Sequence, residues 1–352
     1  MLNRRIRVAV VGIGEIATRA HIPAYLSNKY VDLIALVDID RKKVEKATKK
    51  FGVKQFYSSV DELFEKQEVD AVSVCTPPST HEDIALKALG FGAHVLCEKP
   101  LATTVDGGKR MVRASQKEKK ILMVGFNRRF WPTYQQAKKL ISKGRLGHVY
   151  CAMDHVLSSS PLLGWGKSHW FYEPGVGGAL LDLGPHVFDM LNYILGDFPV
   201  AVSAFDYTHL YSPVEEFCVC VLEYPDERVG VGLVSWLSST YVENLNILGT
   251  AQNLFVSPDL LLEANPTDIL PLVLWGKVTK LLFSLKFPDS PLSSKKVDTY
   301  ALEVNHFVKQ IMDNRGSSQD AMNALNVVIT CEGARKALET NRRIEISSLK
   351  EV

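Results

Sequence analysis

Two hydrophobic patterns follow each other along the chain. In the first third, five short runs rich in Val, Ile, Leu and Ala alternate with amphipathic stretches of helical period. The runs are almost wholly apolar, as expected for strands buried on both faces, and span residues 6–11, 31–37, 71–75, 94–97 and 121–124. This alternation predicts an α/β domain with a doubly wound parallel sheet.

Later in the chain, β-rich or alternating runs follow one another with short turns between them, such as Tyr224-Pro-Asp-Glu. They span residues 147–156, 200–209, 216–223, 229–237, 245–248 and 253–256. Helices are predicted around residues 177–189 and 320–339, and a closing strand at 343–346. We therefore expect a first α/β domain at 1–124 and a second, strand-rich α/β domain at 125–352.

The amino-acid composition limits the classes of binding partner that we expect for this protein. The 352 residues suit two domains, and 46% hydrophobic with 23% charged residues is typical of a globular protein. With a net charge of +2 and no basic run interleaved with aromatic residues, nucleic acid is not expected as a partner, and a small molecule is.

The cysteines and the N-terminus favour a reduced, cytoplasmic protein. The six cysteines lie mostly in strand-like runs and show no Cys-x-x-Cys spacing, so no metal site is predicted. The first apolar run is too short for a secretory signal. Residues 268–287 form an apolar stretch with three lysines, which suits burial against protein or a subunit interface better than contact with a membrane surface.

A glycine fingerprint follows the first strand. In Gly12-Ile-Gly14-Glu-Ile-Ala17, Gly12 allows a tight turn, Gly14 lets the backbone approach a pyrophosphate, and Ala17 takes the third position. Asp38 ends the second strand, 24 residues after Gly14, where a carboxylate accepts hydrogen bonds from a ribose. The sequence therefore predicts a bound dinucleotide.

The acidic side chain favours NAD over NADP. Arg41 and the two lysines after it are positioned to hold a 2′-phosphate, but Asp38 would repel that group. The basic trio is equally consistent with an exposed first helical turn. Predicted cofactor contacts are Gly12, Ile13, Gly14, Glu15, Ile16, Asp38, Arg41, Thr76, Pro77, His81, Glu98 and Lys99.

Two further loops should border the cofactor because ligands bind at the carboxyl ends of parallel strands. Thr76, Pro77 and His81 follow the third strand, although His81 also suits a helix start in contact with water. Glu98-Lys99-Pro100 follows the fourth strand, so Lys99 should lie near the nicotinamide, where a lysine can take or share a hydroxyl proton.

The segment Gly177-Gly178-Ala-Leu-Leu-Asp182-Leu-Gly184-Pro185-His186-Val-Phe-Asp189 places proton-handling side chains in an apolar stretch. If the segment is helical, Asp182, His186 and Asp189 share one face. The paired glycines leave room for a close neighbour such as a flat cofactor ring. Pro185 has no amide proton, so the helix should begin near it or bend there.

With these motifs in this order, the sequence resembles the glucose-fructose oxidoreductase, inositol dehydrogenase and MocA (Gfo/Idh/MocA) family. Gly125-Phe-Asn127-Arg128-Arg129-Phe is similar to the family's segment at the start of the second domain. The resemblance implies that residues 1–124 form a dinucleotide-binding Rossmann domain. It implies that residues 125–352 form a domain for substrate binding and oligomer contacts, an α/β domain with an open-faced, mainly antiparallel sheet. It also implies a homodimer or homotetramer and a cis Lys99–Pro100 bond.

The resemblance assigns catalytic roles to Lys99, Asp182 and His186. His186 is the first choice as base, Lys99 would polarise the substrate oxygen and relay or share the proton, and the roles of these two can be exchanged. Asp182 would orient the substrate or bias the imidazole. Many relatives have Trp-Arg before the double glycine, where this chain has Trp170-Phe171. The contact made by that arginine is therefore either absent or supplied from elsewhere, with Arg128 and Arg129 as candidates. Predicted substrate contacts are Lys99, Asn127, Arg128, Trp170, Asp182 and His186, with Trp170 either facing a sugar or packing between domains.

The expected function is an NAD-dependent dehydrogenase acting on one hydroxyl-bearing carbon of a sugar, cyclic polyol or nucleotide sugar. Two alternatives remain at this point. One is a cofactor-binding regulator without catalysis, and the other is an enzyme whose bound nicotinamide is recycled within one reaction.

Overall fold

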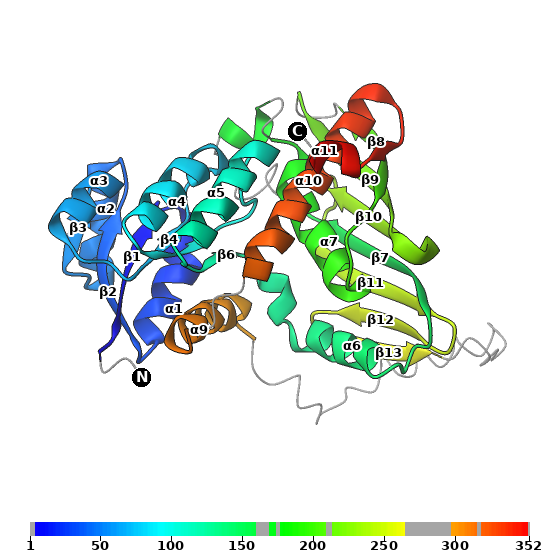
Figure 1. The fold of residues 1–352 in the computed structure, drawn as a ribbon, viewed down its shortest axis with the longest axis horizontal. Coiled ribbons are helices and arrows are strands. Elements are labelled where there is room, and N and C mark those ends of the chain that lie inside the picture. Colours follow the sequence, from blue (N-terminus) through cyan, green and yellow to red (C-terminus); the bar gives the residue numbers. More distant parts are fainter. Residues whose placement is uncertain are drawn as a thin grey trace.

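Two sheets lie side by side, joined by helices from the C-terminal part of the chain (Figure 1). This computed structural model describes residues 4–159, 169–173, 177–208, 213–264, 297–314 and 318–350. The apolar basic stretch 268–287 lies outside the described residues. Among the described residues, no helix combines the length and apolar character needed to cross a membrane.

The first sheet has six parallel strands in the order β3-β2-β1-β4-β5-β6. These are β1 (Ile6–Val11), β2 (Val31–Val37), β3 (Gln55–Tyr57), β4 (Ala71–Val74), β5 (His94–Cys97) and β6 (Leu122–Val124). The helices are α1 (Ile22–Ser27), α2 (Arg41–Phe51), α3 (Val60–Lys66), α4 (His81–Gly90) and α5 (Val105–Lys117). The predicted doubly wound sheet is confirmed, and its strand order reverses between β1 and β4, where ligands bind in such sheets.

The second sheet has eight strands in the order β13-β12-β11-β7-β10-β9-β8-β14. They are β7 (Val149–Leu157), β8 (Ala201–Thr208), β9 (Glu215–Glu223), β10 (Val229–Ser235), β11 (Val242–Gly249), β12 (Asn253–Ser257), β13 (Leu260–Ala264) and β14 (Ile344–Glu345). Only β7 and β10 pair in parallel, so the mainly antiparallel sheet is also confirmed.

One face of this sheet carries α7 (Ala179–Leu195), which contacts β7, β9 and β10. Gly232 lets the helix lie close, because a Cβ there would be 2.7 Å from Val187 Cγ1. The helix begins at Ala179, six residues before Pro185, and runs on through it. Pro185 therefore does not set the start of the helix. Hydrophobic burial on both sides of Pro185 outweighs the one lost amide bond.

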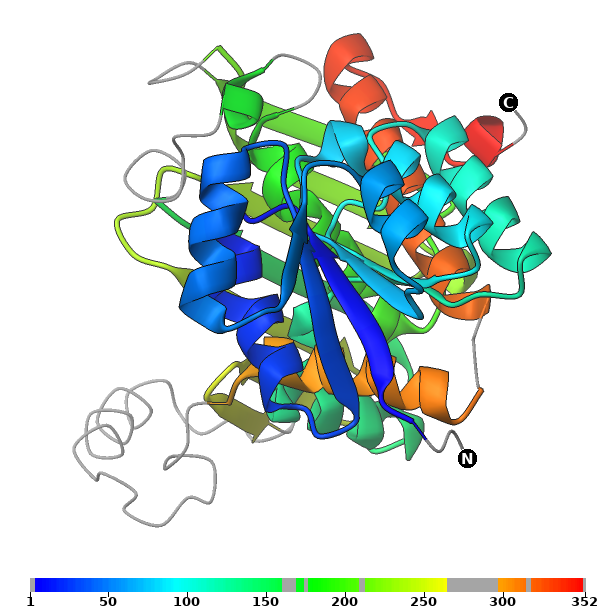
Figure 2. The ribbon, with the colours of Figure 1, turned by 90° about the vertical axis from the view of Figure 1, so that its left-hand side faces the viewer.

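The C-terminal helices close the seam between the sheets (Figures 1 and 2). Helix α10 (Ser318–Thr340) packs against α5 and β6 on one side and against α7 and β8 on the other. Helix α9 (Thr299–Met312) packs on α1 and on the turn Asn127–Phe130, which leads into α6 (Pro132–Ser142). The short α11 (Ser347–Lys350) packs against α10. A segment distant in sequence thus fixes how the two sheets face each other.

Candidate active site

A cavity of about 1100 Å³ opens between the two domains. Its volume exceeds the few hundred to about 1000 Å³ of a pocket for one drug-sized ligand, so a dinucleotide and a second molecule fit together. Many predicted site residues line it: Gly12, Ile13, Gly14, Glu15, Ile16, Asp38, Thr76, Pro77, Glu98, Lys99, Trp170, Asp182 and His186.

At one end, the glycine loop packs tightly on the next strand. Gly12 has a φ of +86°, and a Cβ there would lie 2.7 Å from the backbone of Cys75. Only glycine fits both demands. Asp38 holds this loop through Oδ2, which accepts a 2.7 Å hydrogen bond from Ile13 N, and Lys43 Nζ lies 3.3 Å from the same oxygen. The acid at the tip of β2 therefore faces the cavity beside the loop, as a ribose contact requires.

His81 and Arg41 do not line the cavity. His81 is fully buried, and its two ring nitrogens lie 2.8 Å from Pro100 O and 2.9 Å from Thr76 O. His81 therefore joins the loop after β4 to the turn after β5. It is positioned neither to contact the cofactor nor to face water at the start of α4. Arg41 instead lies over the ring of Phe56, its guanidinium 5.8 Å from the ring centre.

Lys99 and Asp182 meet across the domain boundary. Lys99 Nζ lies 3.0 Å from Asp182 Oδ1 and donates to Asp182 O at 2.9 Å. Trp236 Nε1 donates to the other carboxylate oxygen at 3.2 Å. The Lys99–Pro100 peptide is cis, as the resemblance implied. The loop after β5 and the first turn of α7 are thereby fixed to each other.

His186 lies one turn after Asp182 and also lines the cavity. Burial, followed by the positive charges of Lys99 and Arg128, lowers the pKa of His186 well below its usual value. Its Nδ1 is buried with no hydrogen-bond partner among the described residues. The imidazole is therefore neutral at physiological pH and has a nitrogen lone pair to accept a proton.

Asp189, expected on the same face, serves another purpose. Its carboxylate accepts from Arg129 Nε at 2.8 Å and from the terminal nitrogen of the same side chain at 2.6 Å. Asp189 is buried and does not line the cavity. Arg129 is consequently committed to this pair and is not positioned to replace the arginine that many relatives carry beside the double glycine.

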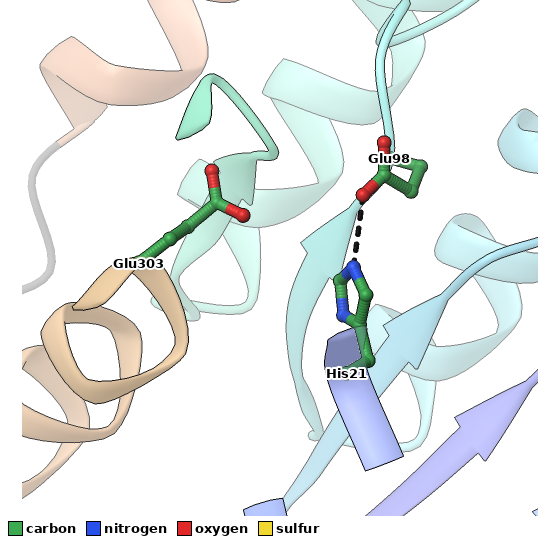
Figure 3. Close-up of side chains that lie close together, drawn as sticks. All are labelled: His21, Glu98 and Glu303. Atoms are coloured by element: carbon green, nitrogen blue, oxygen red, sulfur yellow. Dashed lines mark hydrogen bonds and ion pairs between the residues drawn. The ribbon is translucent and has the colours of Figure 1, made fainter. Parts of the chain in front are cut away.

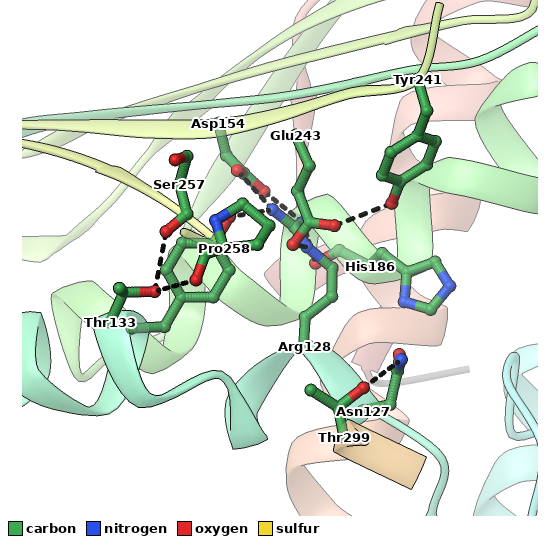
Figure 4. A network of polar contacts seen from close by, with 11 residues as sticks. Asn127, Arg128, Thr133, Asp154, His186, Tyr241, Glu243, Ser257, Pro258 and Thr299 are labelled. Atoms are coloured by element: carbon green, nitrogen blue, oxygen red, sulfur yellow. Dashed lines mark hydrogen bonds and ion pairs between the residues drawn. The ribbon is translucent and has the colours of Figure 1, made fainter. Parts of the chain in front are cut away.

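Arg128 and Asn127 are likewise held away from the cavity (Figure 4). Arg128 is buried and donates to both oxygens of Asp154, at 2.7 and 2.8 Å, and to Glu243 at 2.7 Å. It also donates to His186 O at 3.2 Å, while the imidazole of His186 points away from the network. Asn127 donates to Thr299. The predicted substrate contacts of Asn127 and Arg128 do not fit this geometry, because two carboxylates already neutralise the guanidinium.

The double glycine has a different neighbour from the one expected. A Cβ on Gly177 would overlap Phe171 O, and one on Gly178 would overlap Glu215 Oε1. The chain's own turn His169–Tyr172 and a carboxylate from β9 occupy the space we assigned to a cofactor ring. In that turn Trp170 stacks on Phe171 with ring centres 3.9 Å apart and lines the cavity.

Glu215 caps the helix that carries Asp182 and His186. Its Oε1 accepts a 3.1 Å hydrogen bond from Leu180 N, in the first turn of α7. A carboxylate at this end of a helix is favoured by the unpaired amide groups and the helix dipole. Burial, reinforced by the nearby charge of Asp206, raises the pKa of Glu215 to about 7. Sequence reasoning missed this residue because its partner lies 35 positions away.

Three aromatic residues were also missed. Tyr241 and Tyr300 line the cavity, and Tyr241 donates from its hydroxyl to Glu243 at 2.7 Å. Trp236 orients Asp182, as described above. Each of these residues lies at the end of a strand or the start of a helix and belongs to no local sequence motif. Their place in the site therefore becomes clear only from the folded structure.

Comparison with known protein families identifies both domains. A model of the GFO_IDH_MocA oxidoreductase family, described as an NAD-binding Rossmann fold, matches residues 6–126. A second model, of the GFO/IDH/MocA C-terminal domain, matches residues 134–254. The two matches together span most of both sheets.

Individual relatives share part of their length with this chain. It is 32% identical to D-glucoside 3-dehydrogenase of Escherichia coli (strain K12) over 203 residues, 58% of this chain and 57% of the relative. It is also 32% identical to myo-inositol 2-dehydrogenase of Thermotoga maritima over 197 residues, 54% of this chain and 55% of the relative. The chain thus spans little more than half the length of these curated relatives.

The fold as a whole is shared more widely. The WlbA dehydrogenase from Bordetella pertussis, solved with NADH and UDP-GlcNAcA, superposes with a TM-score of 0.83 over 98% of this chain and 99% of its own. The sequence identity is 21%, so this likeness concerns the fold alone.

We expect Glu215→Gln to change the pH dependence of stability. The folded pKa of about 7 lies above the ordinary value of 4.5, so the folded state holds an extra proton between these values. The stability from this proton is fully present below about pH 4.5 and is lost as the pH rises through about 7. Glutamine has no such proton to lose. The excess unfolding free energy of the native protein over Glu215→Gln should therefore fall across this interval.

Urea unfolding at a series of pH values measures this difference. Glu65→Gln, which alters an exposed carboxylate on α3, is the matched control and should show no such trend. Parallel pH profiles for the native protein and Glu215→Gln would contradict the assignment.

Proposed function

Since the chain belongs to the Gfo/Idh/MocA family of oxidoreductases, we propose that it transfers a hydride between NAD and a secondary hydroxyl or ketone of a sugar, cyclic polyol or nucleotide sugar. Its first domain is the NAD-binding Rossmann fold of that family. The observation that carries the proposal is the single cavity that joins the glycine loop and Asp38 to Lys99, Asp182 and His186. NAD, when bound, accepts the hydride.

The proton must leave the substrate hydroxyl as the hydride leaves the carbon. Neutral His186 is the proposed base, and a positioned base contributes about a hundredfold to ten-thousandfold. Lys99, held by Asp182, is proposed to donate a hydrogen bond to the substrate oxygen and stabilise its developing negative charge. Asp182 and Trp236 keep the ammonium in place rather than reacting themselves.

The substrate class rests on the relatives and on the walls of the cavity. The two relatives compared above are named for a glucoside and for myo-inositol, both cyclic polyhydroxy compounds. Trp170, Tyr241 and Tyr300 offer aromatic faces and hydroxyls that suit such rings. Arg128 and Arg129 form ion pairs with Asp154 and Asp189, so these arginines do not support a charged substrate.

Asp38 and Lys43 support NAD as the cofactor. The carboxylate is in place for a ribose, and Lys43, which would be needed for a 2′-phosphate, is paired with it. The presence of Lys99, Asp182 and His186 in one cavity favours a catalyst over a cofactor-binding regulator. The cytoplasmic location remains a prediction.

We further propose that the uncovered face of the second sheet joins two copies of this chain. On this face, Val221, Val231 and Met153 form one cross-strand row, and Phe205, Val219 and Leu233 form the next. Phe205 is 68% exposed. Apolar side chains in continuous rows on an open sheet are typical of a protein interface.

Val221→Glu should break this association. A buried, unpaired carboxylate costs several kcal/mol and would appear on both sides of a two-fold contact. Size-exclusion chromatography with light scattering should give a dimer or tetramer for the native protein and for the exposed-surface control Lys49→Glu. For Val221→Glu it should give half that mass, a monomer or a dimer respectively. A monomeric native protein would refute the interface.

For catalysis, we expect His186→Asn and Lys99→Met each to reduce kcat by a hundredfold or more, as expected from loss of a positioned base or electrostatic contact. The assay is NADH formation with a panel of inositols, aldoses, glucosides and uridine-diphosphate sugars. NAD affinity, followed by quenching of protein fluorescence, should change little. The pH profile of the residual rate tells which variant has lost the base.

Arg145→Met, on the surface between α6 and β7, is the control and should turn over normally. Undiminished turnover in both His186→Asn and Lys99→Met would contradict the proposed roles of these residues. NAD binding without turnover of any compound would favour the regulator instead.

A further inference from the structure

A second group of polar side chains, of which Glu98 lines the cavity and His21 and Glu303 do not, takes no part in the proposed chemistry (Figure 3). His21 comes from the π-helical turn Ala17–His21, Glu98 from the end of β5, and Glu303 from α9. One ligand atom of each lies within 4.8 Å of the other two. His21 and Glu303 are fully buried, and Glu98 is 8% exposed.

Glu303 points into this group, and neither of its carboxylate oxygens has a hydrogen-bond partner in the part of the chain that the structure describes. Burial, together with the charge of Glu98, raises the pKa of Glu303 well above its usual value. A carboxyl group in this position needs either a proton or a positive charge beside it, because a buried, unpaired carboxylate costs several kcal/mol.

His21 is held in a fixed orientation. Its Nδ1 lies 3.0 Å from Ser73 Oγ, which lies 2.9 Å from the hydroxyl of Tyr25. This leaves Nε2 facing the carboxylates, 2.8 Å from Glu98 Oε1. A histidine whose second ring nitrogen is oriented by a hydrogen bond is typical of metal ligands. The wide turn that presents His21 is a feature often found at functional sites.

We propose that His21, Glu98 and Glu303 bind one first-row divalent cation, with Mn²⁺ and Zn²⁺ as the best-suited ions. One imidazole and two carboxylates are ligands that both ions accept. Because the three ligand atoms lie within 4.8 Å of one another, a single ion between them reaches all three after a small contraction. The ion balances two carboxylates and gives Glu303 the partner it lacks.

This site would have a structural consequence. Glu303 belongs to α9, whereas His21 and Glu98 belong to the Rossmann domain. A bound ion would therefore fasten the returning C-terminal helix to the first domain, directly beside Lys99. The expectation of a protein without a metal site, drawn from the cysteine spacing, did not consider a histidine and two carboxylates brought together from three distant segments.

The direct experiment is equilibrium dialysis of chelator-treated protein against Mn²⁺ or Zn²⁺, with the bound metal measured by mass spectrometry. We expect about one ion per chain at saturation, and a thermal midpoint that rises with free metal concentration, because the ion binds only the folded state. Neither readout depends on turnover, so failure of this proposal is separate from failure of the dehydrogenase proposal.

Glu303→Gln distinguishes a cation from a proton. Glutamine has the shape of a protonated glutamate, so this variant should fold, yet it should lose the bound ion and the metal-dependent rise in thermal midpoint. Glu65→Gln is the matched control and should keep both. If the native protein binds no more Mn²⁺ or Zn²⁺ than Glu303→Gln, the proposal is overturned and Glu303 holds a proton. Should Glu303→Gln fail to fold, His21→Gln takes its place, and absence of metal from the native protein overturns the proposal on its own.

Discussion

The ion pair between Lys99 and Asp182 joins the two domains at the point where the proposed chemistry takes place. Lys99 follows a strand of the parallel sheet, and Asp182 lies in the first turn of the helix that covers the antiparallel sheet. The pair is largely buried, so breaking it would leave an unpaired charge against the cavity, at a cost of several kcal/mol. The pair therefore ties the loop after β5 to the first turn of α7, one turn before His186.

Several other features keep the helix end in register with this pair. Glu215 binds the amide of Leu180, and the two glycines let the turn around Phe171 approach the same helix start. On the far side, Arg128 holds His186 O and pairs with Asp154 and Glu243. Charged groups thus hold the backbone that presents Asp182 and His186 to the cavity.

Much of the fold was predictable because its signals are local. A few residues of sequence are enough to recognise the buried parallel strands, the glycine fingerprint and Asp38. The short strands β3 and β13 were not predicted, since β3 has three residues and β13 is largely exposed. Among site residues, Lys99, Asp182 and His186 come together in the cavity as expected, which leaves their roles to experiment. Arg128 and His81 could not be placed from sequence, because their partners are distant carboxylates and backbone carbonyls.

The most direct test of the central claim is isotope transfer. Cyclic sugars and polyols deuterated at their secondary carbons are incubated with the protein and NAD, and the NADH formed is examined by mass spectrometry. Our account predicts that at least one compound yields deuterated NADH, and that Lys99→Met abolishes this product. If no compound delivers deuterium to NAD while the cofactor is demonstrably bound, the cavity does not support hydride transfer from a secondary alcohol and the account is wrong.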